Sequence, residues 1–235
     1  MTTHAPGDTP LSWGLADAIS ANDGTAEDIN WIDVPIAELD LIFTVPRMPL
    51  RMKINDRMMA VSASYAEQVR VCKLLGCVSP THAWFQAIWR AAKVKLTPCP
   101  LVSTATDAMK MGDFDFLTRE NDNFDKQIAA NADALSDPTV FPRGFAKAWL
   151  MGILMGEQGA HGAENEGFEY PDGHELQHEG GMHNDSHLDY SQWIWDIIKR
   201  MAKKISTGEQ VDLLELQRAQ FPQFKARLDE YENAA

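Results

Sequence analysis

Hydrophobic residues recur at helical spacing between residues 64 and 76, where they fall near one face of a helix. These positions are Ala66, Val69, Val71, Leu74 and Leu75. Gly76 follows the last of them, and glycine commonly ends a helix because it adopts the left-handed backbone conformation without steric cost. The pattern therefore predicts a helix that stops at Gly76.

Two further helices are predicted in the middle of the chain, within residues 79–96 and 115–135. The first has Ser79 and Thr81 as candidate N-caps, with Pro80 beside them. The second is polar, so we expect it to lie on the surface with few residues facing inward. The expected inward positions are Trp84, Ile88 and Trp89 in the first helix and Phe116, Phe124 and Ile128 in the second.

The region after residue 190 is also predicted to be helical. Residues 191–206 place five hydrophobic residues on a helical stripe, and residues 210–235 form a helix interrupted at Pro222. The stripe consists of Ile194, Ile197, Ile198, Met201 and Ile205. The C-terminal part of the chain is therefore expected to be built from helices.

Strands are predicted mainly in the N-terminal third. Residues 31–36 (WIDVPI) alternate between apolar and polar, and residues 39–54 combine β-branched residues with two prolines, which is typical of edge strands. Residues 93–102 contain two prolines and are expected to be extended. Residues 148–156 (AWLMGILMG) form the longest apolar run, which is too short to span a bilayer and is expected in the core.

These elements predict an α+β fold, helix-rich, in a single domain with a few short strands. The chain has 235 residues and 45% hydrophobic composition, which is enough to bury one core. We expect a flexible N-terminal arm at 1–29 and a core domain at 30–207. The core domain includes a loop rich in histidine and acids at 157–191, and a helical tail at 208–235 follows it.

Composition limits the function. The net charge is −13, so we expect no binding to nucleic acid or to an anionic membrane surface. No secretory signal is visible, and a cytoplasmic location is the simplest expectation, with export by a route without a signal as the alternative. Cys72, Cys77 and Cys99 are too few for a disulfide framework, and we expect Cys72 and Cys77 to be buried as small hydrophobic residues.

One stretch differs from the rest of the chain in charge. From Ala148 to Ile198 there is no Lys or Arg, while the same span holds ten acidic residues and five histidines. The histidines are His161, His174, His178, His183 and His187. Carboxylates near imidazoles favour bound cations, so this stretch is a candidate site for a metal ion or a positively charged group. A solvated acidic loop without function is the alternative.

Residues 174–178 spell His-Glu-x-x-His, which binds zinc in proteases when it lies on a helix. Pro-Asp-Gly stands before it and Glu-Gly-Gly after it, which leaves room for a single helical turn only. Asn184 stands where the longer form of the motif needs a third histidine. We therefore expect a looser site for a divalent metal such as Zn²⁺ rather than a zinc-protease helix. Its candidate ligands are His174, His178 and His183, with Asp185 or Asp189.

Four short stretches occur in a characteristic order. They are SPTHAWFQAIWRAAKVKLTPCP (79–100), ENDNFDKQ (120–127), YPDG (170–173) and His183 followed by LDYS (188–191). This order resembles an uncharacterised family of bacterial proteins. Its pattern has a Leu-Pro-Thr helix start, an extended KL-x-P-x-P segment, an HN…Q helix, W-H-x-x-DG, and a histidine followed by DYSHG. The resemblance covers roughly residues 30 to 195.

The resemblance implies a cluster of site residues, with Asp172 and Gly173 in the turn before it. The cluster consists of His183, Asp189, Tyr190 and Ser191. We expect Asp172 and Glu169 to contact a substrate. Two family histidines are replaced here, one by Glu169 and one by Gln192, so an altered or inactive site is also consistent with the sequence.

Two classes of function fit these residues. The first is a hydrolase acting on a polymer such as the cell wall, in a bacterial or phage setting. In it, His183 serves as general base or metal ligand, Asp189 orients it, and Tyr190 or Ser191 supplies a hydroxyl. The second is a non-catalytic acidic protein, such as an inhibitor, immunity or assembly factor, that recognises a basic partner. The sequence leaves the oligomeric state open.

Overall fold

The computed structural model describes residues 14–22, 24–101, 113–151, 163–169, 171–172, 175–180, 191–222 and 229, with the backbone alone at 163–169 and 175–180. The predicted α+β fold is confirmed, with short strands and helices mixed along one domain. The helices are α1 (Leu15–Ala21), η1 (Ala37–Leu39, a 3₁₀ turn), α2 (Tyr65–Leu75), α3 (His82–Ala91), α5 (Phe114–Ala130), α6 (Ala132–Leu135) and α7 (Leu213–Gln220). The strands are β1 (Trp31–Ile36), β2 (Leu41–Pro46), β3 (Arg51–Ile54), β4 (Arg57–Ala60), β5 (Cys77–Val78), β6 (Val94–Lys95), β7 (Pro142–Arg143), β8 (Ala148–Met151), β9 (Ala163–Glu169), β10 (Glu175–Gly180), β11 (Ile198–Lys199), β12 (Met201–Lys204) and β13 (Gln210–Asp212).

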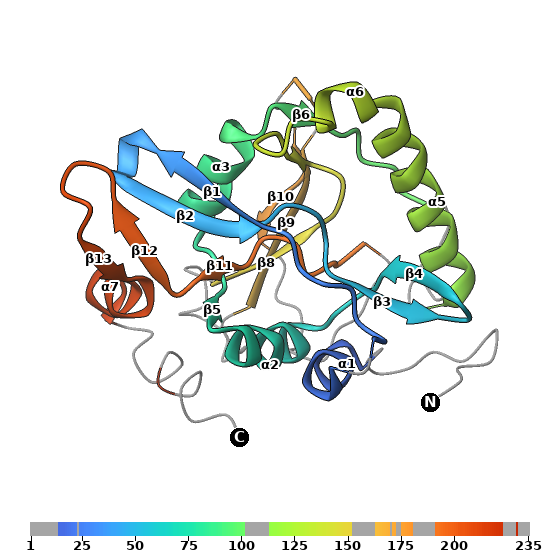
Figure 1. Cartoon of the computed structure of the whole chain (residues 1–235), viewed down its shortest axis with the longest axis horizontal. Helices are drawn as coiled ribbons and strands as arrows, with labels where there is room; N and C mark the ends of the chain where they lie inside the picture. The colour runs from blue at the N-terminus through green and yellow to red at the C-terminus, as the bar shows by residue number, and fades with distance from the viewer. Residues whose placement is uncertain are drawn as a thin grey trace.

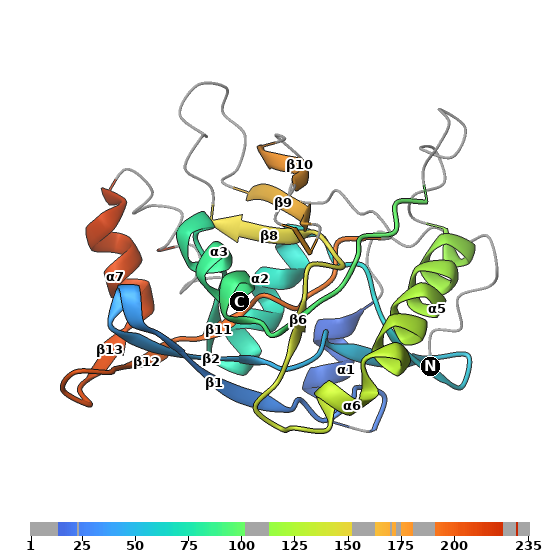
Figure 2. The same ribbon diagram turned by 90° about the horizontal axis from the view of Figure 1, so that it is seen from above.

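The largest sheet has four antiparallel strands in the order β1-β2-β12-β13. Figure 1 shows this sheet at the front, with α5 along the opposite edge of the molecule. Seen from above, the sheet lies along one side, the β10-β9-β8 sheet lies on the other, and α3 lies between them (Figure 2). Phe43 of β2 packs on Trp84 of α3, with ring centroids 5.5 Å apart, so the main core lies between the sheet and this helix.

Helix α2 forms where the sequence predicts it, although its buried face is different. Ser64 caps the helix by accepting a hydrogen bond from the Glu67 backbone N–H. Leu74, an expected inward residue, is 49% exposed, whereas the side chains of Glu67 and Gln68 are buried. The reason lies in hydrogen bonds that these two side chains form with distant parts of the chain. Glu67 accepts from the Ala16 backbone N–H at 2.8 Å, and Gln68 donates to the Trp149 carbonyl at 2.9 Å.

Gly76 ends α2 with a φ of 61°, in the left-handed region. An added Cβ would meet no atom within 4 Å, so only the backbone conformation would oppose a side chain there. We expect Gly76→Ala to lower the free energy of unfolding by about 1 kcal/mol. Urea unfolding measures this, and a variant as stable as the wild type would contradict it.

Residues 191–197, here called the central segment, are not helical, and this overturns the helix predicted over 191–206. The central segment is extended and fully buried, and β11 and β12 follow it. Met201 and Ile205, expected on the buried stripe, are 47% and 43% exposed. Four of the seven residues of the central segment are apolar, and such a short apolar run fits a helix and a buried extended segment equally well.

The first and the last described helices, α1 and α7, are packed on the main core. Helix α1 lies within residues 1–29, which were predicted to form a flexible arm, and its Leu15 and Ala16 are buried in the main core. At the other end the predicted helix is only partly correct, because β13 precedes it and the helix begins at Leu213. Leu213 and Leu214 are buried in the same core.

Strand β8 confirms the core position expected for the apolar run, because all four of its residues are buried. Cys72 and Cys77 are buried as expected. Burial raises the pKa of the Cys77 thiol well above its usual value, so this thiol stays protonated. Within the part of the chain that the structure describes, no helix is long and apolar enough to cross a membrane.

Candidate functional site

The histidine-rich stretch begins on a β-hairpin. Strands β9 and β10 pair antiparallel, with Glu169 opposite Glu175 and Gly167 opposite Gln177, and the register shifts before Gly180. Part of the predicted loop at 157–191 is therefore regular sheet. The segment from Glu175 to His178 is extended, which agrees with the expectation that His-Glu-x-x-His is not a zinc-protease helix here.

The same stretch ends in the core. Ser191 is fully buried, and its carbonyl accepts a hydrogen bond from the Lys147 backbone N–H at 2.9 Å. The next carbonyl, that of Gln192, accepts from the Ala63 N–H at 2.7 Å, and the carbonyl of Ile194 accepts from the Leu50 N–H at 2.9 Å. The described chain thus stops at strand β10 before residues 181–190 and resumes in the core after them.

The predicted site residues are placed unevenly by the structure. Glu169 ends β9 and His178 lies on β10, so the hairpin brings their strands side by side. Asp172 lies in the exposed turn between these strands. Ser191 lies in the core, with a side chain that is closed to solvent. The other predicted site residues, which lie outside the described part of the chain, are His174, His183, Asp189 and Tyr190.

The predicted metal site also falls largely outside the described residues. Where side chains are described, no group of three or more His, Cys, Asp or Glu is placed to hold a metal ion. The imidazoles of His174 and His183 are not among those side chains, and only the backbone of His178 is. A Zn²⁺ site formed by these three histidines therefore stays a prediction.

Two buried charged residues were missed by the sequence reasoning. Lys147 is 8% exposed and lies at the point where the chain returns to the core, since its backbone bonds Ser191. Glu120 of α5 is 0% exposed. A signal for Glu120 was present, because it lies four residues from Phe116 and from Phe124 and so shares their inward face. Buried charged groups are rare and often belong to functional sites.

Cys99 lies beside Glu120 and is half-buried. Its sulfur accepts a hydrogen bond from the Asn123 side-chain amide at 3.0 Å. Burial raises the pKa of the Cys99 thiol, and the negative charge of Glu120 raises it further. A protonated thiol is a poor nucleophile, so Cys99 does not qualify as a catalytic cysteine.

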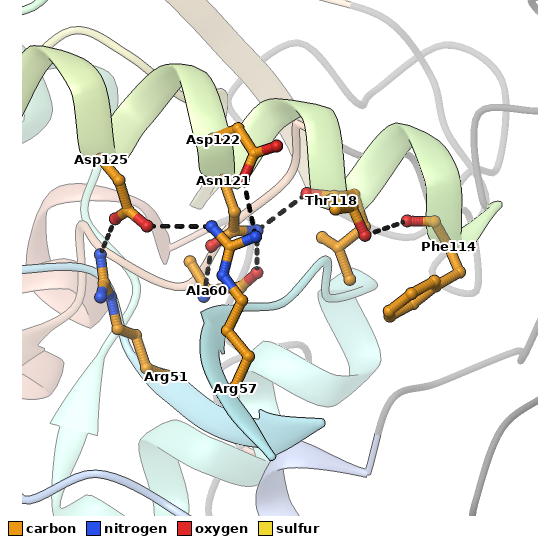
Figure 3. A network of polar contacts seen from close by, with 9 residues as sticks. Arg51, Arg57, Ala60, Phe114, Thr118, Asn121, Asp122 and Asp125 are labelled. Carbon is orange, nitrogen blue, oxygen red and sulfur yellow. Dashed lines mark hydrogen bonds and ion pairs between the residues drawn. The ribbon is translucent and has the colours of Figure 1, made fainter. Parts of the chain in front are cut away.

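The stretch ENDNFDKQ, which carries part of the family resemblance, fixes α5 to the body of the fold. The Asn121 side chain pairs with both the N–H and the carbonyl of Ala60, each at 2.8 Å (Figure 3). Gln127 pairs in the same way with the N–H and carbonyl of Thr97, also at 2.8 Å. Each side-chain amide forms the two hydrogen bonds that a neighbouring strand would form with that backbone, so Asn121 and Gln127 have a structural role.

Ion pairs join the same helix to the β3–β4 hairpin. Arg51 contacts Asp125 at 2.9 Å, and Arg57 contacts both Asp122 and Asp125 at 2.7 and 3.0 Å (Figure 3). Most of these side chains are about a third to a half exposed. Exposed ion pairs contribute little, so the buried amide of Asn121 carries more of the docking energy.

The stretch without Lys and Arg contains an acid that nevertheless has a positively charged partner in the fold. Asp196, one of the ten acids, forms a buried ion pair with Arg143, with Nε and Oδ1 2.8 Å apart. Burial raises the pKa of the Asp196 carboxyl, and the positive charge of Arg143 opposes that rise. Asp196 therefore belongs to the core and not to a cation-binding surface.

Comparison of the chain with models of protein families, with curated proteins and with solved structures found no match. The resemblance to the bacterial family therefore rests on its motifs alone.

Proposed function

We propose that the protein is a hydrolase whose site is formed by residues 172–191. The observation that carries the proposal is that residues 181–190 are flanked by two fixed points, strand β10 and the buried Ser191. Functional side chains are commonly held on loops that a rigid scaffold positions. Lys147 supports the same proposal, because this buried charged residue bonds the carbonyl of Ser191 through its backbone N–H.

We assign the roles from the residue types in the sequence and from the described residues. His183 acts as the general base or, where a metal is bound, as one of its ligands, and Asp189 orients it. The hydroxyl comes from Tyr190, because the Ser191 side chain is closed to solvent. Asp172, exposed in the hairpin turn, contacts the substrate together with Glu169. The substrate class that we propose is a polymer such as the cell wall, which fits the combination of His, Asp, Tyr and Ser in the cluster.

We further propose that the site holds one divalent metal ion through His174, His178 and His183. Imidazole nitrogens are common Zn²⁺ ligands, and the acids around them favour a cation. When bound, Zn²⁺ supplies a water molecule of lowered pKa. The protein's own part would be to hold the three imidazoles around the ion, and the backbone of His178 lies on strand β10 of the hairpin.

Metal analysis of protein purified without chelator, combined with assays on esters, peptides, glycosides and peptidoglycan, tests both proposals. We expect about one zinc per chain, and in His183→Ala we expect metal content and hydrolysis to fall by about tenfold or more. The melting temperature should stay within a few degrees of the wild type. His82→Ala, which removes a histidine from the first turn of α3, is the matched control and should keep both properties.

The outcomes separate the alternatives. Protein without metal that still hydrolyses a substrate, and loses this activity in His183→Ala, would remove the metal but keep the hydrolase. Protein that hydrolyses nothing and binds a basic protein, with an affinity that falls steeply with salt and is unchanged in His183→Ala, would replace the hydrolase by the acidic binding protein.

A further inference from the structure

The four-stranded sheet has one face in the core and one face in solvent. Alternate residues of β1, β2 and β12 are buried against α3 and the main core, among them Val34, Phe43 and Ala202. The other residues point away from the core. We call this side the outer face; it consists of Asp33, Pro35, Ile42, Thr44, Met201, Lys203 and Ile205. No helix of the described residues covers the outer face (Figure 2).

The outer face is more apolar than a solvated sheet face should be. Three large hydrophobic side chains are exposed among the described residues, and two of them, Met201 and Ile205, lie on it. The third, Leu74, lies on α2 and is not part of this face. Antiparallel sheets with one wet face usually place polar residues there, so clustered apolar residues indicate an interaction surface.

We propose that the outer face is the contact between two copies of this chain. In a two-fold dimer the same surface serves both partners, so it must complement itself in charge. The outer face meets this requirement, because it carries Asp33 and Lys203 on either side of the apolar pair Pro35 and Ile42. A partner of a single charge sign would match only one of these two residues.

The size of the surface sets the strength of the dimer. At about 3.4 Å per residue the four strands span about 10 to 20 Å each, and at a spacing of about 4.8 Å they give roughly 300 Å² of sheet per copy. Stable complexes bury about 800 Å² per partner. The dimer is therefore weak and forms only at high micromolar concentrations. This inference is independent of the proposed hydrolase.

Sedimentation velocity of the full chain from about 5 µM to about 500 µM tests the proposal. We expect a shift from monomer to dimer over this range and a dissociation constant raised about tenfold or more in Met201→Glu. Ala129→Glu adds the same charge to the exposed face of α5 and should dimerise like the wild type. Circular dichroism checks that both variants fold.

A charge exchange tests the self-complementary pairing. Asp33→Lys should weaken the dimer, and the double variant Asp33→Lys, Lys203→Asp should regain most of the lost affinity, because each lysine again faces an aspartate. A chain that stays monomeric at the highest concentration would overturn the proposal. So would a dimer that Met201→Glu leaves intact, or a double variant as weak as Asp33→Lys alone.

Discussion

Replacing Arg143 by methionine is expected to lower the free energy of unfolding by about 3 to 5 kcal/mol. Arg143 is 1% exposed and forms its ion pair with Asp196, which is 7% exposed. Methionine fills much of the space but carries no charge, so the carboxylate of Asp196 stays in the core without its partner. An uncompensated buried charge is the most costly result of breaking such a pair.

Several other contacts of Arg143 are lost with its charge. Its guanidinium donates to the carbonyls of Pro46 and Pro142, each at 2.8 Å. It also lies over the rings of Phe141 and Trp195, at 5.0 and 4.9 Å from their centroids. One side chain thus joins β2, β7 and the central segment, so its removal loosens the segment that anchors the histidine-rich stretch.

The pH dependence gives this prediction a second readout. Burial raises the pKa of Asp196 in the folded protein, so the folded state holds this proton more tightly than the unfolded state does. Its contribution to stability is therefore present at low pH and is lost as the pH rises through the folded pKa. Without Arg143 the pKa rises further, so Arg143→Met should lose less stability at about pH 5 than at about pH 7.5.

Urea unfolding at both pH values measures the effect. The double variant Arg143→Met, Asp196→Leu removes both charges and should recover much of the loss, because apolar residues can replace a buried pair. A single variant within about 1 kcal/mol of the wild type at neutral pH would show that the pair is not desolvated as its burial indicates.

Local patterns were sufficient for the elements whose sequence signals agree with their packing. Helices α2 and α3 begin at residues that cap them by side chain, Ser64 and Thr81, and α2 ends at a glycine with positive φ. Strand β1 alternates as its sequence predicts. In α3 and β1 propensity and burial favour the same structure, and in α2 the caps alone were sufficient to give the bounds of the helix, which is why the sequence predicts these elements.

The central segment could not be predicted in this way. Its residues are buried on every side, so the helical spacing of Ile194 and Ile197 did not mark the single buried face of a helix. Its structure is decided by partners distant in sequence, since Ala63, Lys147 and Leu50 donate hydrogen bonds to its carbonyls. For the same reason the sequence did not predict the buried face of α2, because the hydrogen-bond partners of the Glu67 and Gln68 side chains lie far away in the sequence.

The candidate site was located by composition and not by periodicity. The absence of Lys and Arg between Ala148 and Ile198 can be read directly from the sequence. Residues that approach the stretch from elsewhere in the chain cannot be read in this way. Arg143 pairs with Asp196, one of the acids of this stretch, and the Lys147 N–H bonds the carbonyl of Ser191, which ends the histidine-rich loop. The absence of Lys and Arg from the sequence therefore identifies a segment, whereas the fold decides which acids of that segment can still bind a cation.

Asn121→Ala is expected to lower the free energy of unfolding by about 3 to 4 kcal/mol, although it removes no charge. The Asn121 side chain is 1% exposed and provides the hydrogen-bond partners of both the N–H and the carbonyl of Ala60. Ala60 is itself fully buried, so alanine at 121 leaves two backbone groups without partners and without access to water. Each such group costs about 1 to 3 kcal/mol.

The ion pairs beside Asn121 provide the matched comparison. Arg57→Ala removes two ion pairs from the same helix and hairpin, yet its side chain is 36% exposed and water can solvate the aspartates that remain. We expect a loss of about 1 kcal/mol or less from it, and less still at high salt. If urea unfolding gave the larger loss for Arg57→Ala, the docking of α5 would depend on charge. We expect the larger loss for Asn121→Ala. That result would show that the hydrogen bonds of the Asn121 amide to the Ala60 backbone hold the helix in place.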